Sequence, residues 1–140
     1  MKRPAFWALL AASTYALAWF LPVYADFSPP SGRIPGWDAF LVALQPEGNG
    51  PLGGALSIAS ALTNFVMLSG LVLLARSASH RVPRWAVVAM GSAALLNQVW
   101  WAWPSEDPTS LRSGYWLWMA TFWLVALLLL FQSRRRRAAA

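Results

Sequence analysis

The sequence has no cysteine and few charged residues of either sign. Its 140 residues include 11 Lys or Arg, 5 Asp or Glu and 1 His, so charged residues make up only 11% of the chain, whereas 58% are hydrophobic. The absence of cysteine excludes disulfide bonds, thiol redox chemistry and thiolate metal sites. Because a soluble domain carries roughly a quarter charged residues, these charges are too few to cover a surface in water. We therefore expect a single domain whose main solvent is lipid.

Four long apolar runs contain no ionisable residue in their interiors. We assign them as membrane spans at about residues 4–22, 55–75, 85–103 and 114–132, each near the ~20 residues that cross a bilayer as a helix. Backbone groups in hydrocarbon need internal hydrogen-bond partners, so these spans must be helical. The predicted fold is an all-α, antiparallel four-helix membrane bundle. Proton-coupled carriers and intramembrane enzymes generally need ionisable groups at depth, so the lack of such groups argues against both classes.

The basic residues are distributed unevenly around these spans. Nine of the 11 lie near the two termini or in the loop at 76–84, whereas all 5 acids lie in the loops at 23–54 and 104–113. By the positive-inside rule, the termini and the loop 76–84 should be cytoplasmic and the other two loops should face outward, in a bacterial inner membrane. Basic residues confined to the ends of apolar runs are typical of topology signals. We therefore expect membrane lipid, and no nucleic acid, as a partner.

The first apolar run has a second interpretation as a secretory signal peptide. A basic start, an apolar centre and the sequence Val23-Tyr24-Ala25 suit cleavage before Asp26. Against this, the run is long for a signal core and has aromatic residues at both of its ends. We favour an uncleaved span, and cleavage remains the alternative.

A short helix is predicted inside the first outer loop, at residues 36–44. Trp37, Phe40, Leu41 and Leu44 follow helical i, i+3, i+4, i+7 spacing. Proline and glycine turn signals flank this segment on both sides. We expect the helix either to lie in the membrane interface or to pack on the rim of the bundle as an ordinary loop helix.

Aromatic residues gather on both sides of the second outer turn. Tryptophan and tyrosine concentrate where a bilayer meets water, because their rings are apolar with one polar edge. Three tryptophans within four positions span more than one helix face, so some of them should pack inward. Trp123, deeper in the last span, should need a hydrogen-bond partner such as Asn64 or Thr63. The rim residues are Trp100, Trp101, Trp103, Tyr115, Trp116 and Trp118.

Asn64, Asn97 and Gln98 are the candidate polar residues inside the membrane. Small residues recur every four positions beside them, as in Gly53, Ser57 and Ala61, which lets helices approach closely in lipid. The favoured interpretation is that the three polar side chains form hydrogen bonds between helices. The alternative is that they line a cavity or pore.

A second group of candidates lies on the outer face. Paired carboxylates at a membrane surface can perform acid–base chemistry or bind a hard cation, although their spacing here matches no catalytic or calcium-loop template. The alternative is pairing with nearby arginines, which contributes under ~1 kcal/mol when exposed. The candidate outer-face contact residues are Asp26, Trp37, Asp38, Glu106, Asp107 and Arg112.

Three segments carry a resemblance to a known class of protein. They are PGWDAF at 35–40, LTN at 62–64 and LRSGYWLW at 111–118. With the four apolar runs, they make the chain similar to small four-span bacterial inner-membrane proteins. The resemblance implies a multi-span membrane fold. These segments contain no catalytic motif, so no activity or site residue carries over.

These observations favour a non-catalytic membrane protein. The leading hypothesis is a subunit of a membrane complex, or a homo-oligomer, that acts through helix packing and outer-loop contacts. The first alternative is a pore or carrier for a small or lipid-like molecule, and the second is a membrane-surface enzyme that uses the outer carboxylates. We expect no cofactor and no metal site, because His80 has no second ligand type nearby.

Overall fold

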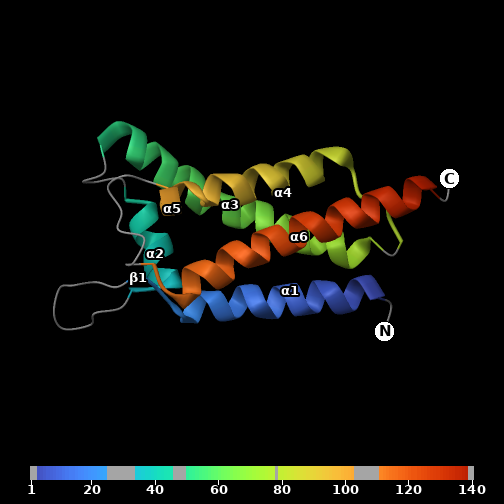
Figure 1. Ribbon diagram of the computed structural model, residues 1–140, viewed down its shortest axis with the longest axis horizontal. Coiled ribbons are helices and arrows are strands. Elements are labelled where there is room, and N and C mark those ends of the chain that lie inside the picture. The colour runs from blue at the N-terminus through green and yellow to red at the C-terminus, as the bar shows by residue number, and fades with distance from the viewer. Residues whose placement is uncertain (1–2, 25–33, 46–49, 78, 103–110, 139–140) are drawn as a thin grey trace.

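The structure is a computed structural model that describes residues 3–24, 34–45, 50–77, 79–102 and 111–138. Within these residues the protein is mostly helical, which confirms the all-α class. Long helical segments lie side by side, and shorter elements gather at one end (Figure 1). The elements in chain order are α1 (Arg3–Phe20), β1 (Pro22–Tyr24), β2 (Ile34–Pro35), α2 (Gly36–Ala43), α3 (Gly50–Arg76), α4 (Arg84–Asn97), α5 (Val99–Ala102) and α6 (Ser113–Ala138).

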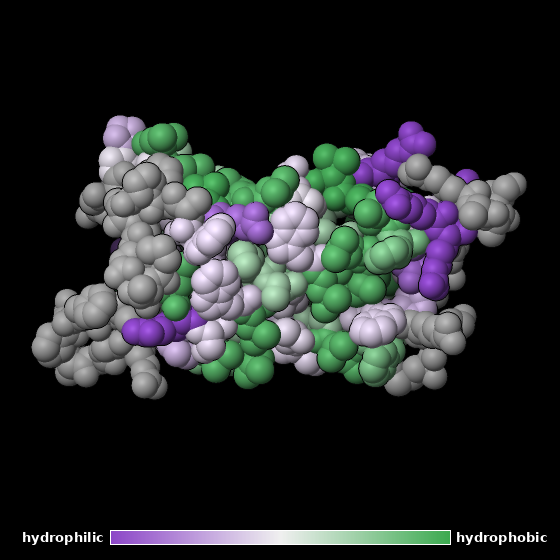
Figure 2. All heavy atoms as spheres, in the orientation of Figure 1, coloured by the Kyte–Doolittle hydropathy of each residue, from purple (hydrophilic) through white to green (hydrophobic). Residues whose placement is uncertain are grey.

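The two ends of the molecule differ in composition. The start of α1, the connection from α3 to α4 and the last turns of α6 lie at one end (Figure 1). Hydrophilic side chains gather at that end, with mostly apolar ones along the middle of the molecule (Figure 2). We call this the basic end, and we call the opposite end, which holds α2, β1 and α5, the aromatic end. The exposed cationic side chains of the basic end are Arg76, Arg81, Arg84, Arg134 and Arg135.

A small sheet at the aromatic end was not expected from the sequence. β1 and β2 pair antiparallel, with Pro22 opposite Pro35 and Tyr24 opposite Ile34. Tyr24 also forms an isolated bridge with Leu111, just before α6. Strands of two or three residues are too short to show an alternating pattern. The pairing therefore joins segments for which the sequence predicts no strand.

The predicted short helix is confirmed as α2. Pro35 precedes it in an extended conformation, and the Gly36 backbone N–H donates to the Leu21 carbonyl at 3.2 Å. A Cβ atom at Gly36 would lie 2.8 Å from the Ala18 carbonyl oxygen and 2.9 Å from the Trp19 Cα atom. Glycine is therefore required for α2 to begin against the end of α1. This contact places α2 across the aromatic end.

The helices differ from the predicted spans at their ends. α3 begins at Gly50, within the segment predicted as loop, and α6 continues through the arginines to Ala138. Arginine is a good helix former, so a helix can continue past its apolar part. α4 ends at Asn97, where the Gln98 backbone N–H donates to the Leu95 carbonyl at 3.1 Å, and α5 follows. α3 and α6 are long and apolar enough to cross a membrane, while the apolar part of α1 is shorter.

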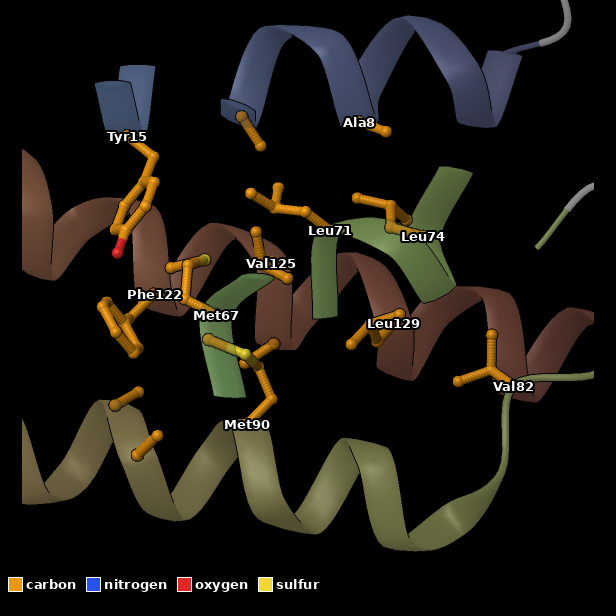
Figure 3. Packing of buried hydrophobic residues seen from close by; sticks show 14 residues of the cluster. Ala8, Tyr15, Met67, Leu71, Leu74, Val82, Met90, Phe122, Val125 and Leu129 are labelled. Atoms are coloured by element: carbon orange, nitrogen blue, oxygen red, sulfur yellow. The ribbon is translucent and has the colours of Figure 1, made fainter. Parts of the chain in front are cut away.

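The middle of the bundle is a closely packed apolar core. α1 packs against α3 and α6, and α4 packs against the same two helices. Tyr15 reaches from α1 into this core beside Phe122 of α6 (Figure 3), with ring centroids 6.5 Å apart. The largest fully buried apolar side chains here are Met67, Leu74, Met90, Phe122, Val125 and Leu129.

The bundle combines its apolar core with large apolar side chains on the surface and a few buried polar ones. Phe65 and Leu68 of α3 are 61% and 51% exposed. Asn97 and Thr121, which are polar, are fully buried. α3 thus buries one apolar face, with Met67, Leu71 and Leu74, and leaves another apolar face exposed.

Candidate functional site

Asn97 lies at the centre of a polar network near the aromatic end. Its Oδ1 atom accepts a hydrogen bond from the Ser60 hydroxyl at 2.8 Å, and its Nδ2 atom donates to Thr63 Oγ1 at 3.0 Å. Its backbone carbonyl accepts from the Tyr115 hydroxyl at 2.9 Å. Asn97 thus joins α4 to both α3 and α6. A buried amide with these partners avoids the cost of an unpaired polar group in an apolar medium.

The Ser60 and Thr63 hydroxyl groups of this network each donate one hydrogen bond. Thr63 Oγ1 donates to the Ser60 backbone carbonyl at 2.6 Å; its other oxygen neighbour, Asn97 Oδ1, is farther away at 3.3 Å. Ser60 donates to Asn97, and its Oγ atom accepts from the Trp100 indole Nε1 at 3.0 Å. Because a hydroxyl has a single proton, Ser60 and Thr63 are both committed as donors.

Asn64 forms a second junction, one that reaches α1. Its Oδ1 atom accepts from the Tyr15 hydroxyl at 2.6 Å and from the Trp118 indole Nε1 at 3.1 Å. Its Nδ2 atom donates to the Ala61 carbonyl, one turn earlier in α3, at 2.9 Å. One amide on α3 therefore ties together α1, α3 and α6.

Trp123 was predicted to pair with Asn64 or Thr63, and the hydrogen bonds of these two residues within the described chain go elsewhere. The indole that donates to Asn64 belongs to Trp118, which lies about one and a half helical turns nearer the aromatic end at 3.6 residues per turn. The expectation that some rim tryptophans pack inward is confirmed. Trp100 and Trp118 donate hydrogen bonds into the bundle, while Trp101 is exposed.

A pocket of about 290 Å³ opens beside this network at the aromatic end. It lies where α2 and β1 cover the ends of α1, α3 and α6. The Trp19 and Phe40 rings meet at its wall, with centroids 5.3 Å apart. Among the described residues that line it, none is charged. Its aromatic lining is Trp19, Tyr24, Phe40, Trp100, Tyr115 and Trp118, and its polar floor is Ser57, Ser60 and Asn64.

The three predicted intramembrane residues are placed differently. Asn64 is in the network and lines the pocket, while Asn97 is in the network and lies behind the pocket wall. Gln98 is half-buried at the end of α4, where its backbone carbonyl accepts from the Trp101 N–H at 3.1 Å. The interhelical role favoured for these residues is therefore confirmed for the two asparagines.

Within the described part of the chain, no side-chain hydrogen bond or ion pair is found between the predicted outer-face residues. Trp37 is 53% exposed, and Asp38 is half-buried in the first turn of α2. Neither lines the pocket. Arg112 is exposed, and its backbone N–H donates to the Val23 carbonyl at 2.8 Å. Asp26, Glu106 and Asp107 lie outside the described residues, so the carboxylate site stays a prediction.

The sequence offers a cavity beside Asn64 only as the alternative interpretation, and it does not predict the rest of the lining. Ser57 is distinguished in the sequence only by its small size, and Phe40 only by its helical spacing. Ser57, Ser60 and Asn64 follow helical i, i+3, i+7 spacing, so the sequence could have predicted that they share one face of a helix. The position of α2 over the pocket could not be predicted from the sequence, because it depends on the pairing of β1 with β2.

No family model matches this chain, and neither a curated protein nor a solved structure shows significant similarity to it.

Proposed function

We propose that this chain is a non-catalytic, four-span membrane protein that binds a small, mostly apolar molecule in the pocket at its aromatic end. The pocket is the observation that carries this proposal. Small-molecule sites are concave and mostly apolar, with a few placed polar groups, and occupy about 300–1,000 Å³. A pocket of about 290 Å³ with aromatic walls and an uncharged polar floor fits the lower end of that range.

The exposed apolar face of α3 supports a location in lipid. The apolar residues that are exposed on α3 would contact hydrocarbon, while the buried asparagines supply contacts between helices. In lipid, helices associate through close packing and such hydrogen bonds rather than through the hydrophobic effect. A surrounding of lipid therefore accounts both for the exposed apolar side chains and for the buried asparagines.

Helix lengths support four spans. α1 has 18 residues, and α4 together with α5 covers positions 84–102. At 1.5 Å per residue these segments are about 27 and 28 Å long, close to a hydrocarbon core of ~30 Å. Among the described helices, α3 and α6 are long and apolar enough to cross a membrane on their own, so α1 and the pair α4 and α5 are the spans that this proposal adds. We place the basic end in the cytoplasm, because arginines near spans remain on that side.

The chemistry of the pocket favours binding over catalysis. General acid–base catalysis needs a side chain that titrates near the working pH, and the described lining offers none. The core on the basic side of the pocket also favours a closed site over a pore. Met67, Met90 and Phe122 are fully buried there, so a continuous path would require the bundle to repack.

A subunit or homo-oligomer role stays a separate prediction. The mass of the purified protein in detergent, with any protein that co-purifies, tests it. A strict monomer without a partner would contradict it.

Filling the pocket tests the binding proposal. Ala39 lines the pocket from α2, whereas Leu41, on the same helix, is exposed and outside the lining. We expect a neutral naphthalene fluorophore to bind saturably to the wild type and to Leu41→Phe in lipid nanodiscs. Ala39→Phe should weaken binding at least tenfold, because its ring occupies the pocket. Equal binding by both variants, or no saturable signal above empty nanodiscs, would contradict the proposal.

A further inference from the structure

One side chain on the pocket floor has an unused hydrogen-bonding group. Ser57 is 4% exposed and lines the pocket. No hydrogen bond is found for its hydroxyl within the part of the chain that the structure describes. Buried polar groups are nearly always paired, and leaving one unpaired costs free energy. A ligand in the pocket would supply the missing partner.

Asn64 offers a second group on the same floor that has no partner among the described residues. Its Oδ1 atom already accepts two hydrogen bonds, which fill both lone pairs. Its Nδ2 atom carries two protons, of which one is donated to the Ala61 carbonyl. Ser60, between these residues, is already committed as a donor. The groups that the floor can offer to a ligand are therefore mainly hydrogen-bond donors, namely the Ser57 O–H and one Asn64 N–H.

These two groups lie on one face of α3. Seven positions separate Ser57 from Asn64, which is two helical turns and about 10 Å. Much of the remaining lining is aromatic, with Trp19, Phe40 and Trp118. Flat rings gain from offset or edge-to-face contact with such side chains, beyond the area they bury. A charged ligand would lose its hydration without gaining an opposite charge from the described lining.

We infer that the pocket takes an uncharged ring compound bearing acceptor oxygens, such as two ring carbonyls, one of which accepts a hydrogen bond from Ser57 and the other from Asn64. This inference rests on the proposed binding function and specifies the class of its ligand. The pocket is lined by elements of the aromatic end, including α2 and β1, which the proposed topology places at the outer face, so such a compound can reach it from the outer leaflet or from water.

Three probes of similar size test the class. They are 2-methyl-1,4-naphthoquinone, which is neutral with ring carbonyls, 2-methylnaphthalene, which lacks oxygen, and 2-naphthoate, which is charged. Binding is measured by equilibrium dialysis of full-length protein in nanodiscs, with empty nanodiscs subtracted. The chain has no cysteine, so the quinone forms no thiol adduct. We expect it to bind about tenfold more tightly than 2-methylnaphthalene, as hydrogen bonds from a buried site allow, and 2-naphthoate to bind weakest.

Ser57→Ala is the decisive variant. It removes no hydrogen bond within the described protein, so the fold should be unchanged. We expect it to remove most of the tenfold preference for the quinone while leaving the binding of 2-methylnaphthalene unaffected. Ser69→Ala is the matched control, because Ser69 is exposed on the same helix and bonds only its own helix, at the Phe65 carbonyl. The control should keep the full preference.

The outcomes separate this inference from the proposed function. Equal binding of the two neutral rings, or an unchanged preference in Ser57→Ala, would overturn the ligand class and leave the pocket as a binding site. Tightest binding of 2-naphthoate would overturn the neutrality of the ligand. Absence of saturable binding for all three probes would overturn the proposed function as well. A naphthoquinone with an isoprenoid tail, placed in the nanodisc lipid, distinguishes the sources: it displaces the soluble probe only if membrane-borne rings reach the pocket.

Discussion

The junction at Asn64 makes a quantitative prediction about helix association. Tyr15→Phe removes one hydrogen bond of 2.6 Å and leaves Asn64 Oδ1 with the Trp118 donor. Interhelical hydrogen bonds in membrane proteins average ~0.6 kcal/mol and reach ~1.7. Because this bond is short and buried, we expect Tyr15→Phe to lower the free energy of unfolding by about 1 kcal/mol.

Asn64→Leu should cost more, because it leaves groups without partners. It removes the acceptor of both Tyr15 and Trp118. The Tyr15 hydroxyl is buried, and a phenol cannot reach the carbonyls of its own helix as serine and threonine do. An unpaired buried polar group costs about 1–3 kcal/mol. We expect a total loss of about 2–3 kcal/mol, combining that cost with the lost hydrogen bonds.

A double-mutant cycle isolates the coupling. In the Tyr15→Phe background there is no tyrosine hydroxyl to strand, so Asn64→Leu should cost about 1–2 kcal/mol less than in the wild type. The measurement is unfolding in mixed micelles, with the helical signal followed as denaturing detergent is added. Additive losses, with no coupling between Tyr15 and Asn64, would refute this account of the junction.

Two further substitutions probe close packing and the second junction. Gly114→Ala should lower Tm strongly in a thermal melt, because the added Cβ atom would lie 2.7 Å from the Leu21 and Pro22 carbonyl oxygens. Gly91→Ala is the control: no atom lies within 4 Å of its added Cβ, so Tm should stay unchanged or rise. Equal effects of the two substitutions would contradict the packing of α6 against the end of α1. Asn97→Leu should lower the free energy of unfolding by about 1–2 kcal/mol through its lost side-chain bonds to α3, and an unchanged detergent midpoint would count against that network.

Much of the helical architecture could be predicted from the sequence. In apolar runs without ionisable residues, hydrogen bonding within the backbone dictates a helix. The helical spacing of apolar residues at 36–44 also predicted a short helix, and α2 confirms it. The small-residue stripe at Gly53, Ser57 and Ala61 correctly predicted a buried face on α3.

The rest depends on contacts between distant segments. β1 pairs with β2, and Tyr24 bridges to Leu111, but neither contact has a local signature. The same holds for which indole reaches Asn64: both Trp118 and Trp123 are on α6, and only the relative depth of the helices selects Trp118. The pocket forms through these contacts, so the sequence predicts the polar face of α3 that lines it but not the position of α2 and β1 over that face.

The most direct test of the central claim is the position of each end of the bundle relative to a membrane. The chain has no cysteine, so single cysteines placed at exposed Ser79 and Gln45 can be labelled without background. A membrane-impermeant maleimide should label Gln45→Cys in intact bacterial spheroplasts and Ser79→Cys only after lysis. Labelling of Ser79→Cys in intact spheroplasts, or recovery of the protein in the soluble fraction, would contradict a four-span protein with its basic end in the cytoplasm.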